Sequence, residues 1–449
     1  MAYTQTATSQ IDFEEAKFTN FHKKIIGGGM LGQYADGYIL GSIGISISLA
    51  TEQLGLTTFW LGLIGAGSLI GLMLGSLFIG PLADRIGRRV IFLTTMVIFL
   101  IASIMQFFVS TAEELMVLRV ILGVAIGADY AVGLTMVSEW SPTRIRGRVL
   151  SFLMVMWVSG YVSAYVIGYL LQFLGENGWR YILLSSAIPS LVALVIRWGT
   201  PESPSWLAGR NRTEEANAII HRCLGPEYSM SPTLEQPPAA KWSELFSPKW
   251  RNNTMVGGVF FACQVIPYFA ISIFLPSLLE NLNVENPYAS GIIYNIFLLV
   301  GVLIGMWLIN VISRRLFLVG SFYICAAALL AMTVWQNMPA FYALAGLSIF
   351  SLVISAASVL EFAYPPELFP TELRASGVGL AVAISRVGGA AGTFLLPVVM
   401  DLFGTSAALG GCFLALMVGG VVCQRYAPET SPQIMEKRLG KAQTAAAKA

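Results

Sequence analysis

Long apolar runs alternating with short polar segments dominate the hydrophobicity pattern of this chain. Each run has about 20 residues or more with few charges, the length that a helix needs to cross the ~30 Å hydrocarbon core of a bilayer. We expect twelve such spans, at residues 25–50, 59–82, 90–109, 115–138, 149–174, 180–199, 252–280, 288–312, 316–335, 340–363, 376–401 and 405–426. The pattern therefore predicts an all-α membrane protein with twelve transmembrane helices.

A hinge of the same design follows the fourth and the tenth predicted spans. Glu139 precedes Arg146 and Glu367 precedes Arg374 at the same spacing, and the two copies lie 228 residues apart (367 − 139 and 374 − 146). The loops that follow spans 2 and 8 also match, because each ends in a pair of adjacent arginines. A duplicated chain of this kind predicts two pseudo-symmetric six-helix bundles with the substrate site between them.

The repeat and the polar segments suggest five parts. These are an N-terminal tail (1–24), a first bundle (25–199), a linker (200–250), a second bundle (251–426) and a C-terminal tail (427–449). Within the linker, residues 213–223 and 241–246 have the spacing of short amphipathic helices that lie on the membrane surface. Residues 1–20 and the tail after Pro428 are polar, and we expect both to be disordered.

Composition supports a membrane protein and excludes several other classes. Only 12% of the 449 residues are charged, about half the share of a soluble protein. With both termini in the cytoplasm, 24 of the 27 basic residues lie on that side, which indicates a multi-pass protein of the inner (plasma) membrane. The basic residues sit in short loops, so we expect no nucleic-acid partner. The five cysteines lack metal-ligand spacing, and we expect no metal and no cofactor.

Three short motifs resemble those of a known family. Gly80–Arg89 resembles the signature loop of the major facilitator superfamily, G-x-L-a-D-R-x-G-R-[RK]. Pro201–Leu207 resembles the PESPRWL motif of the sugar porters, with Ser205 in place of arginine, and Pro428–Thr430 is similar to their PET motif. The resemblance implies the major facilitator fold and transport by alternating access.

Further stretches are similar to a narrower group. Proton-coupled sugar porters carry Gly-Tyr-Asp in span 1, where this chain has Gly37-Tyr38-Ile39 and an acid three residues earlier, at Asp36. Gly127–Tyr130 is similar to the GGDYP stretch of phosphate:proton symporters, and Ser385–Pro397 to bacterial metabolite:proton symporters. The resemblance implies symport of a proton with a sugar acid, sugar or other carboxylate by a monomer in the bilayer. A proton-coupled exporter or antiporter, an uncoupled facilitator and a substrate sensor stay open. An intramembrane enzyme is disfavoured, since the spans hold no His pair, Cys/His dyad or Gly-x-Ser-x-Gly turn.

Four charged residues lie more than two residues from either end of a predicted span, and charged residues inside a span usually serve transport. At 1.5 Å per residue, Asp36, Asp129 and Arg386 fall roughly 15–18 Å from the nearest cytoplasmic charge, near mid-membrane, and Arg119 falls roughly 30 Å away, near the outer surface. We expect Asp36 and Asp129 to share and exchange a proton, with Arg119 in the coupling machinery as in sugar porters. Arg386 is the candidate anchor for an anionic substrate group. Alternatively, the aspartates pair with an arginine to fix helix packing, Arg386 pairs with Glu361, and Arg119 snorkels to water.

Aromatic and amide side chains in the spans are candidates for substrate contacts. Amides and phenols bind hydroxyl groups, and a tryptophan face stacks on a sugar ring. The candidates are Gln33, Tyr38, Tyr130, Trp157, Tyr161, Gln264, Tyr268, Tyr294 and Asn295. Packing is the competing role for each aromatic residue, whereas an amide within a span needs a polar partner.

Charges around the duplicated hinges are candidates for a cytoplasmic gate. They are Asp84, Arg85, Arg88, Glu139, Arg146, Glu361, Glu367 and Arg374. We expect Asp84 to face the N-terminus of span 11, where the helix dipole favours an anion, and Arg88, Glu139 and Arg146 to form one ion network. The second half has Asn310 where the first has an acid, so its network is expected to be weaker.

Overall fold

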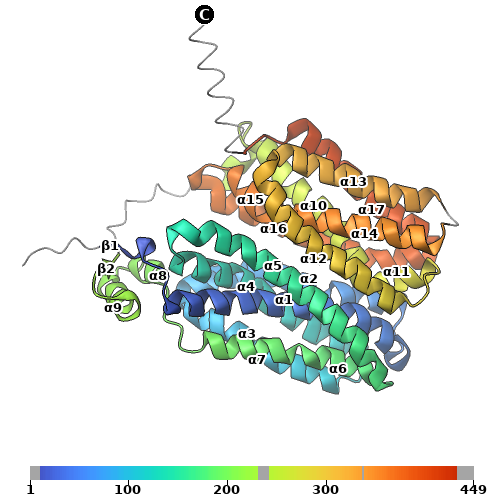
Figure 1. The fold of residues 1–449 in the computed structure, drawn as a ribbon, viewed down its shortest axis with the longest axis horizontal. Helices are drawn as coiled ribbons and strands as arrows, with labels where there is room; N and C mark the ends of the chain where they lie inside the picture. Colours follow the sequence, from blue (N-terminus) through green and yellow to red (C-terminus); the bar gives the residue numbers. More distant parts are fainter. Residues whose placement is uncertain (1–10, 231–241, 336–337, 432–449) are drawn as a thin grey trace, which may run out of the picture.

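The computed structural model describes residues 11–230, 242–335 and 338–431, and these are almost entirely helical (Figure 1). The first bundle contains α1 (Asn20–Leu54), α2 (Thr58–Ile86), α3 (Arg88–Met105), α4 (Ala112–Trp140), α5 (Thr143–Leu171), α6 (Gly178–Ser185) and α7 (Ala187–Arg197). The second contains α10 (Arg251–Ile273), α11 (Leu275–Asn281), α12 (Pro287–Val311), α13 (Arg314–Val334), α14 (Ala340–Ser358), α15 (Leu360–Glu367), α16 (Thr371–Phe403) and α17 (Thr405–Tyr426). Single 3-10 turns, η2 (Gln106–Phe108) and η3 (Gln172–Leu174), extend α3 and α5.

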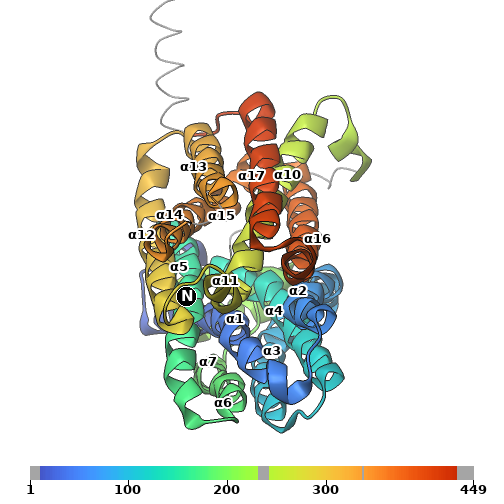
Figure 2. The same ribbon diagram turned by 90° about the vertical axis from the view of Figure 1, so that its right-hand side faces the viewer.

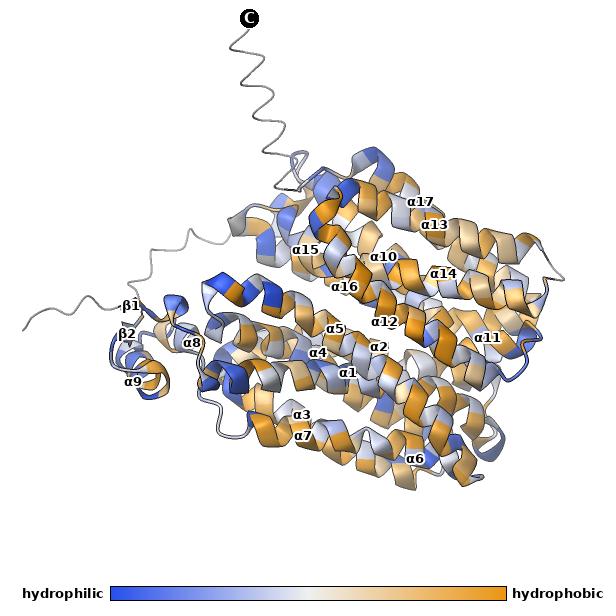
Figure 3. Cartoon of the chain, viewed as in Figure 1, coloured by the Kyte–Doolittle hydropathy of each residue, from blue (hydrophilic) through white to orange (hydrophobic). Residues whose placement is uncertain are grey.

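The helices have the length and composition of membrane spans. Among the described residues, eleven helical segments are long and apolar enough to cross a bilayer. The remaining span is α1, whose 35 residues measure about 52 Å at 1.5 Å per residue. Hydrophobic residues dominate the middle of both bundles, and hydrophilic residues gather toward the helix ends (Figure 3). The predicted twelve-helix fold of two bundles is confirmed.

The two bundles repeat one packing pattern. In the first, α1 packs on α5, α2 on α4 and α3 on α7; in the second, α10 packs on α16, α12 on α14 and α13 on α17. These pairs correspond when α1 is matched with α10 and the helices are followed in order. Seen from the end of the helices, the second bundle lies above the first, and the two pack together through α2 with α16 and α5 with α12 (Figure 2).

One end of the molecule carries the start of α1, the linker after α7 and the end of α17, and we call it the basic end. The bundles meet in the half remote from it. There the Thr58 hydroxyl donates to Asp401 Oδ2 at 3.1 Å, and the hydroxyls of Ser48 and Ser277 lie 3.5 Å apart. Among the described residues, no hydrogen bond or ion pair joins the two bundles at the basic end. The molecule is therefore closed at the end opposite the basic end.

Small elements cover the basic end of the first bundle. They are β1 (Ile11–Asp12), η1 (Phe13–Glu15), α8 (Pro204–Ala208), α9 (Thr213–Leu224) and β2 (Tyr228–Ser229), whereas η4 (Trp242–Phe246) packs on α10 and α16 of the second bundle. β1 pairs with β2 in parallel, and Phe13 packs with Ile220 and Tyr228. The expectation of disorder was therefore wrong for residues 11–20, because these apolar contacts and the strand pairing hold them. Residues 1–10 and 432–449, expected to be disordered, and Lys241 lie outside the described residues.

Glycines allow α1 and α5 to approach closely. A Cβ added at Gly160 would collide with the Tyr34 carbonyl oxygen, and one at Gly37 would collide with the Trp157 carbonyl oxygen. Neither collision can be relieved by a side-chain rotation, because the obstructing atoms belong to the backbone. This crossing places Asp36 and Trp157, on neighbouring helices, toward the middle of the molecule.

Gly160→Ala should lower the free energy of unfolding by about 1–3 kcal/mol, as overpacked cores do. Gly147→Ala is the matched control on the same helix, since a Cβ there meets no atom within 4 Å, and it should stabilise by roughly 0.5–1 kcal/mol. Thermal unfolding of both variants in detergent, followed by size-exclusion chromatography, gives the comparison. Equal midpoints for the two variants would contradict the close α1–α5 crossing.

Candidate functional site

A narrow cavity lies between the two bundles at mid-height. Its walls come from both halves, with Tyr130, Met154 and Trp157 from the first bundle and Val265, Tyr268, Phe269, Ser358, Glu361 and Arg386 from the second. Its free volume is about 20 Å³, and one water molecule requires roughly 10–15 Å³ by the same measure. The cavity is therefore contracted around its lining side chains in this conformation.

Arg386 is the cation of this cavity. Its guanidinium carbon lies 5.4 Å from the centre of the Tyr130 ring and 6.0 Å from that of Phe261. The side chain is only 5% exposed, and its Nε has no hydrogen-bond partner in the described ranges of the chain. Among the described residues, no carboxylate lies within ion-pair distance of Arg386. A buried guanidinium with donors to spare is suited to bind an anionic group.

Glu361 lies in the same cavity, which corrects its assignment to the cytoplasmic gate. It is partly exposed to the cavity and interacts electrostatically with Arg386. Six residues of helix separate it from Glu367, and these correspond to about 9 Å of depth. That rise is enough to carry Glu361 from the helix end to the wall of the central cavity.

A buried ion pair lies inside the first bundle, beside α1. Arg197 donates to Asp129 Oδ1 at 2.5 Å and to Oδ2 at 2.9 Å, and both side chains are fully buried. The Thr95 hydroxyl donates to Asp129 Oδ1 at 3.1 Å, and the guanidinium lies over the Phe92 ring at 3.8 Å. Arg197 also donates to the carbonyl oxygens of Gly28 and Phe92, at 2.9 and 2.8 Å. Nearly all of its donors are thus occupied.

Sequence reasoning missed Arg197 and counted it among the basic residues of the cytoplasmic loops. It stands close to the predicted end of its span, where a basic residue is usually a topology signal. The glycines at the start of α1 are the sequence feature that could have indicated it. In the structure, a Cβ added at Gly32 would collide with the Arg197 guanidinium. The glycine-rich start of α1 makes room for a large side chain from a neighbouring helix.

Asp36 lies next to this ion pair but accepts no hydrogen bond from Arg197, whose partners among the described residues are Asp129, Thr95 and two backbone carbonyls. The side chain is fully buried and interacts electrostatically with Asp129 and Arg197. Its Oδ2 accepts a hydrogen bond from Gln33 Nε2 at 3.2 Å, and its Oδ1 has no partner among the residues that the structure describes. An ionised carboxylate with one neutral donor is costly in a site that water does not reach. The first bundle therefore places two carboxylates beside one cation.

Arg119 is fully buried, so the interpretation that it snorkels to water is wrong. Its Nη1 donates to the Ile39 carbonyl oxygen at 3.0 Å, while Nε and Nη2 have no partner. The side chain stands ten residues from Asp129 on α4, about 15 Å along the helix. The structure therefore separates Arg119 from the aspartate pair.

The structure brings only some of the predicted contact residues to the cavity. Tyr130, Trp157 and Tyr268 line it directly. The other six do not line the cavity. Tyr161 stacks on Trp157 with the ring centres 5.8 Å apart, and the hydroxyls of Tyr294 and Tyr38 form hydrogen bonds with Ser272 at 2.9 Å and Ser185 at 2.8 Å. The amides of Gln264 and Asn295 donate to the carbonyl oxygens of Ile354 at 3.5 Å and Gly291 at 2.8 Å, and Gln33 donates to Asp36. Tyr38 faces α6 within the first bundle, so it is not a cavity residue in this conformation.

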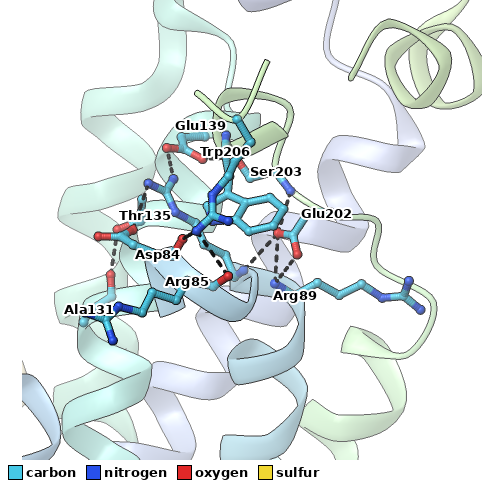
Figure 4. Close-up of polar contacts among 11 residues, drawn as sticks. Asp84, Arg85, Arg89, Ala131, Thr135, Glu139, Glu202, Ser203 and Trp206 are labelled. Atoms are coloured by element: carbon cyan, nitrogen blue, oxygen red, sulfur yellow. Dashed lines mark hydrogen bonds and ion pairs between the residues drawn. The ribbon is translucent and has the colours of Figure 1, made fainter. Parts of the chain in front are cut away.

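The gate charges form a compact network at the basic end of the first bundle (Figure 4). Arg88 pairs with Glu139, which also accepts a hydrogen bond from Ser203. Glu202 Oε1 accepts from the backbone N–H groups of Arg88 and Arg89 at 3.1 and 3.0 Å. The network therefore joins the end of α4, the start of α3 and the loop after α7.

The second bundle has an equivalent network. Arg314 pairs with Glu367 at 3.5 Å, and Thr430 donates to Glu367 at 2.5 Å. Glu429 accepts from the N–H groups of Arg314 and Arg315 at 3.1 and 3.3 Å. Asn310 occupies the position that corresponds to Asp84 of the first bundle. Asp84 contributes little to the ion network there, because it lies 3.8 Å from Arg88 and its side chain is 70% exposed.

Two of the predicted gate contacts are wrong. Arg146 pairs with Glu14 at 3.1 Å and not with the Arg88–Glu139 network, because the ordered N-terminal segment supplies a nearer acid. Within the described part of the chain, the Asp84 carboxylate has only Arg88 as its partner, because the bundles are apart at the basic end. The Asp84 carbonyl oxygen accepts from Trp206 and Arg210. The Arg85 carbonyl also accepts from Arg210 at 3.2 Å, and Arg374 is exposed.

Comparisons with known proteins agree with this geometry. Residues 4–437 match the family described as sugar (and other) transporter. The chain is 39% identical over 425 residues to the inner membrane metabolite transport protein YgcS of Escherichia coli strain K12, covering 94% of this chain and 95% of that protein. It is 27% identical to the arabinose-proton symporter of Bacillus subtilis strain 168, covering 92% and 91%.

A solved structure shares the fold. The xylose transporter XylE from E. coli, in a partially occluded inward open conformation, matches with a TM-score of 0.76 and 18% identity over 92% of this chain and 99% of that one. Together with the family match and the 39% identical relative, this shared fold confirms the resemblance to the major facilitator superfamily. On the family match and the 39% identical relative, this multi-pass inner membrane protein belongs to the sugar (and other) transporters.

Proposed function

We propose that this transporter carries a small organic metabolite with an anionic group, such as a sugar acid or another carboxylate, together with a proton. The observation that carries the proposal is Asp36, a fully buried carboxylate beside a cation whose donors are taken by Asp129 and backbone carbonyls. A proton is the smallest partner that satisfies this carboxylate. The name of the arabinose-proton symporter, a member of the same family, agrees with proton coupling.

The proton site is the group of Asp36, Asp129 and Arg197. Two carboxylates and one guanidinium leave one negative charge uncompensated in a site shielded from water, so one proton completes the balance. Since both oxygens of Asp129 bond to Arg197, Asp36 is the residue that binds and releases it. Arg197 holds Asp129 in place and so keeps the proton on its neighbour.

The substrate site is the cavity at Arg386. The guanidinium binds the anionic group, and Tyr130, Trp157 and Tyr268 contact the rest of the molecule. Glu361 lines the same wall, so it competes with the substrate for Arg386. Tyr130 follows Asp129 in sequence, and the Arg386 guanidinium carbon lies 5.4 Å from the centre of its ring. α4 thus connects the proton site with the substrate site.

The direction of opening follows from the charge distribution. Under the positive-inside rule the basic end, with both termini, faces the cytoplasm. Because the bundles are joined at the opposite end, this is an inward-facing conformation with a contracted binding cavity. An antiporter or an uncoupled facilitator would use the same cavity, and the response to a proton gradient separates these functions from symport.

Asp36→Asn should abolish accumulation driven by an acid-outside gradient and leave substrate exchange intact, because the amide cannot carry a proton. Substrates are first identified by a thermal-shift screen of sugars, sugar acids and aromatic acids, and uptake is then measured in proteoliposomes. Glu52→Gln, near the exposed end of the same helix, is the control. Undiminished accumulation by Asp36→Asn would remove Asp36 from coupling, and accumulation indifferent to the gradient in the unmodified protein would indicate a facilitator.

Arg386→Gln should weaken binding of a carboxylate substrate by roughly 30-fold or more, because a buried charge-assisted contact contributes about 2–5 kcal/mol. Arg374→Gln, exposed on the same helix, should leave the Kd unchanged. Isothermal titration calorimetry in detergent measures both. If Arg386→Gln binds the substrate as well as the unmodified protein does, Arg386 has no part in recognition.

Arg197→Met should destabilise the protein by about 3–5 kcal/mol, because it leaves Asp129 ionised, buried and unpaired. Adding Asp129→Asn should restore part of the loss, as removing both partners of a buried pair does. Thermal unfolding of the two single variants and the double variant completes the cycle. Strictly additive losses would show that the two residues do not interact.

A further inference from the structure

A second cavity lies at the basic end, on the flank of the first bundle and away from the central site. Its volume is about 500 Å³, within the range of small-molecule sites. Its walls come from the start of α1 (Phe21 and Lys24), the start of α3 (Arg89), the loop after α7 (Thr200) and the end of α9 (Arg222 and Cys223). It shares no lining residue with the cavity between the bundles.

The charges of this cavity are all of one sign. Lys24, Arg89 and Arg222 line it, and no acidic residue does. Arg89 contributes its backbone N–H to Glu202, while its guanidinium extends away from the gate network (Figure 4). Lys24 Nζ donates to the Trp198 carbonyl oxygen at 2.8 Å. Among the described residues, none of the three cations forms an ion pair, so a cleft with a positive field remains.

A buried hydroxyl in the wall points to a ligand independently of the charges. Thr200 is 1% exposed, and no described residue forms a hydrogen bond with its Oγ1. An unmet polar group in a buried position costs about 1–3 kcal/mol, so such groups normally have a partner. An anion held by the surrounding cations would accept a hydrogen bond from this hydroxyl.

We propose that this cavity binds a phosphate group, carried either by a soluble anion or by an anionic lipid of the adjacent leaflet. Three cations favour a multivalent anion over a single carboxylate, and arginine and lysine both bind phosphate oxygens well. The occupant connects α9 to the starts of α1 and α3. These helices carry Asp36 and the gate residue Arg88, so occupancy at this surface site bears on the transport machinery.

Cys223 gives a direct measure of occupancy, because it lines the cavity while the other four cysteines are buried in the bundles. Burial raises the pKa of the Cys223 thiol, and the neighbouring Arg222 opposes that shift, so alkylation by a maleimide is measured at pH 8. The full-length protein is held in phosphatidylcholine nanodiscs with inorganic phosphate, or with chloride at equal ionic strength. Phosphate at twice its Kd should slow alkylation about threefold, by mass action.

A second arm identifies the source of the phosphate. Nanodiscs that contain phosphatidylglycerol, with no inorganic phosphate, should slow the reaction when a lipid headgroup is the occupant. Protection by inorganic phosphate in phosphatidylcholine supports a soluble anion. Equal rates in phosphate, chloride and phosphatidylglycerol would overturn the proposal.

Variants test the cations without touching the thiol's neighbour. Lys24→Gln with Arg89→Gln should abolish the protection, expressed as a ratio of rates in each protein. Arg212→Gln, which removes an exposed arginine paired with Glu215, should retain it. As a readout independent of thiol access, phosphate should raise the melting temperature of Cys223→Ser but not of the same protein with Lys24→Gln and Arg89→Gln. If phosphate still protects Cys223 from alkylation in the double variant, the proposal is wrong.

Discussion

A charge buried between membrane helices has to be neutralised without water, and this requirement shapes both bundles. In the first bundle Asp129 and Arg197 satisfy each other with two short contacts, and Asp36 is left beside them with a single amide donor. In the second bundle Arg386 has aromatic faces around it and Glu361 in the same cavity. The complete ion pair belongs to the first bundle, whereas Arg386 and Glu361 line the cavity between the two bundles.

The same requirement explains how proton and substrate affect one another. Tyr130 belongs to the lining of the central cavity, and the residue before it belongs to the buried ion pair. In the mechanism proposed above, α4 couples the two sites, because it carries both Asp129 of the ion pair and Tyr130, which lies against Arg386.

Sequence reasoning reached the fold because hydrophobic length and internal repeats are properties of the chain alone. It placed Asp36, Asp129 and Arg386 inside the bundles for the same reason. It did not find Arg197, because position along a span gives depth but not the direction of a side chain, and that direction depends on the glycines of α1. It placed Tyr38 in the site, although this residue faces α6, and Glu361 outside the site, although one short helix carries it inward. The partner of Arg146 was hidden because residues 11–20 looked too polar to be ordered.

The two matching networks at the basic end have a consequence for how this molecule moves. In each bundle a glutamate that follows the last helix, Glu202 or Glu429, binds the first backbone amides of the third helix. In each half, the segment that follows the sixth span is therefore bonded to the start of the third span, and this contact closes the half into a ring. A ring of six spans resists internal shear, so the conformational freedom of the transporter is concentrated at the interface between the two halves. Among the described residues, the hydrogen bonds across that interface are few, such as that of the Thr58 hydroxyl with Asp401 and that between the hydroxyls of Ser48 and Ser277.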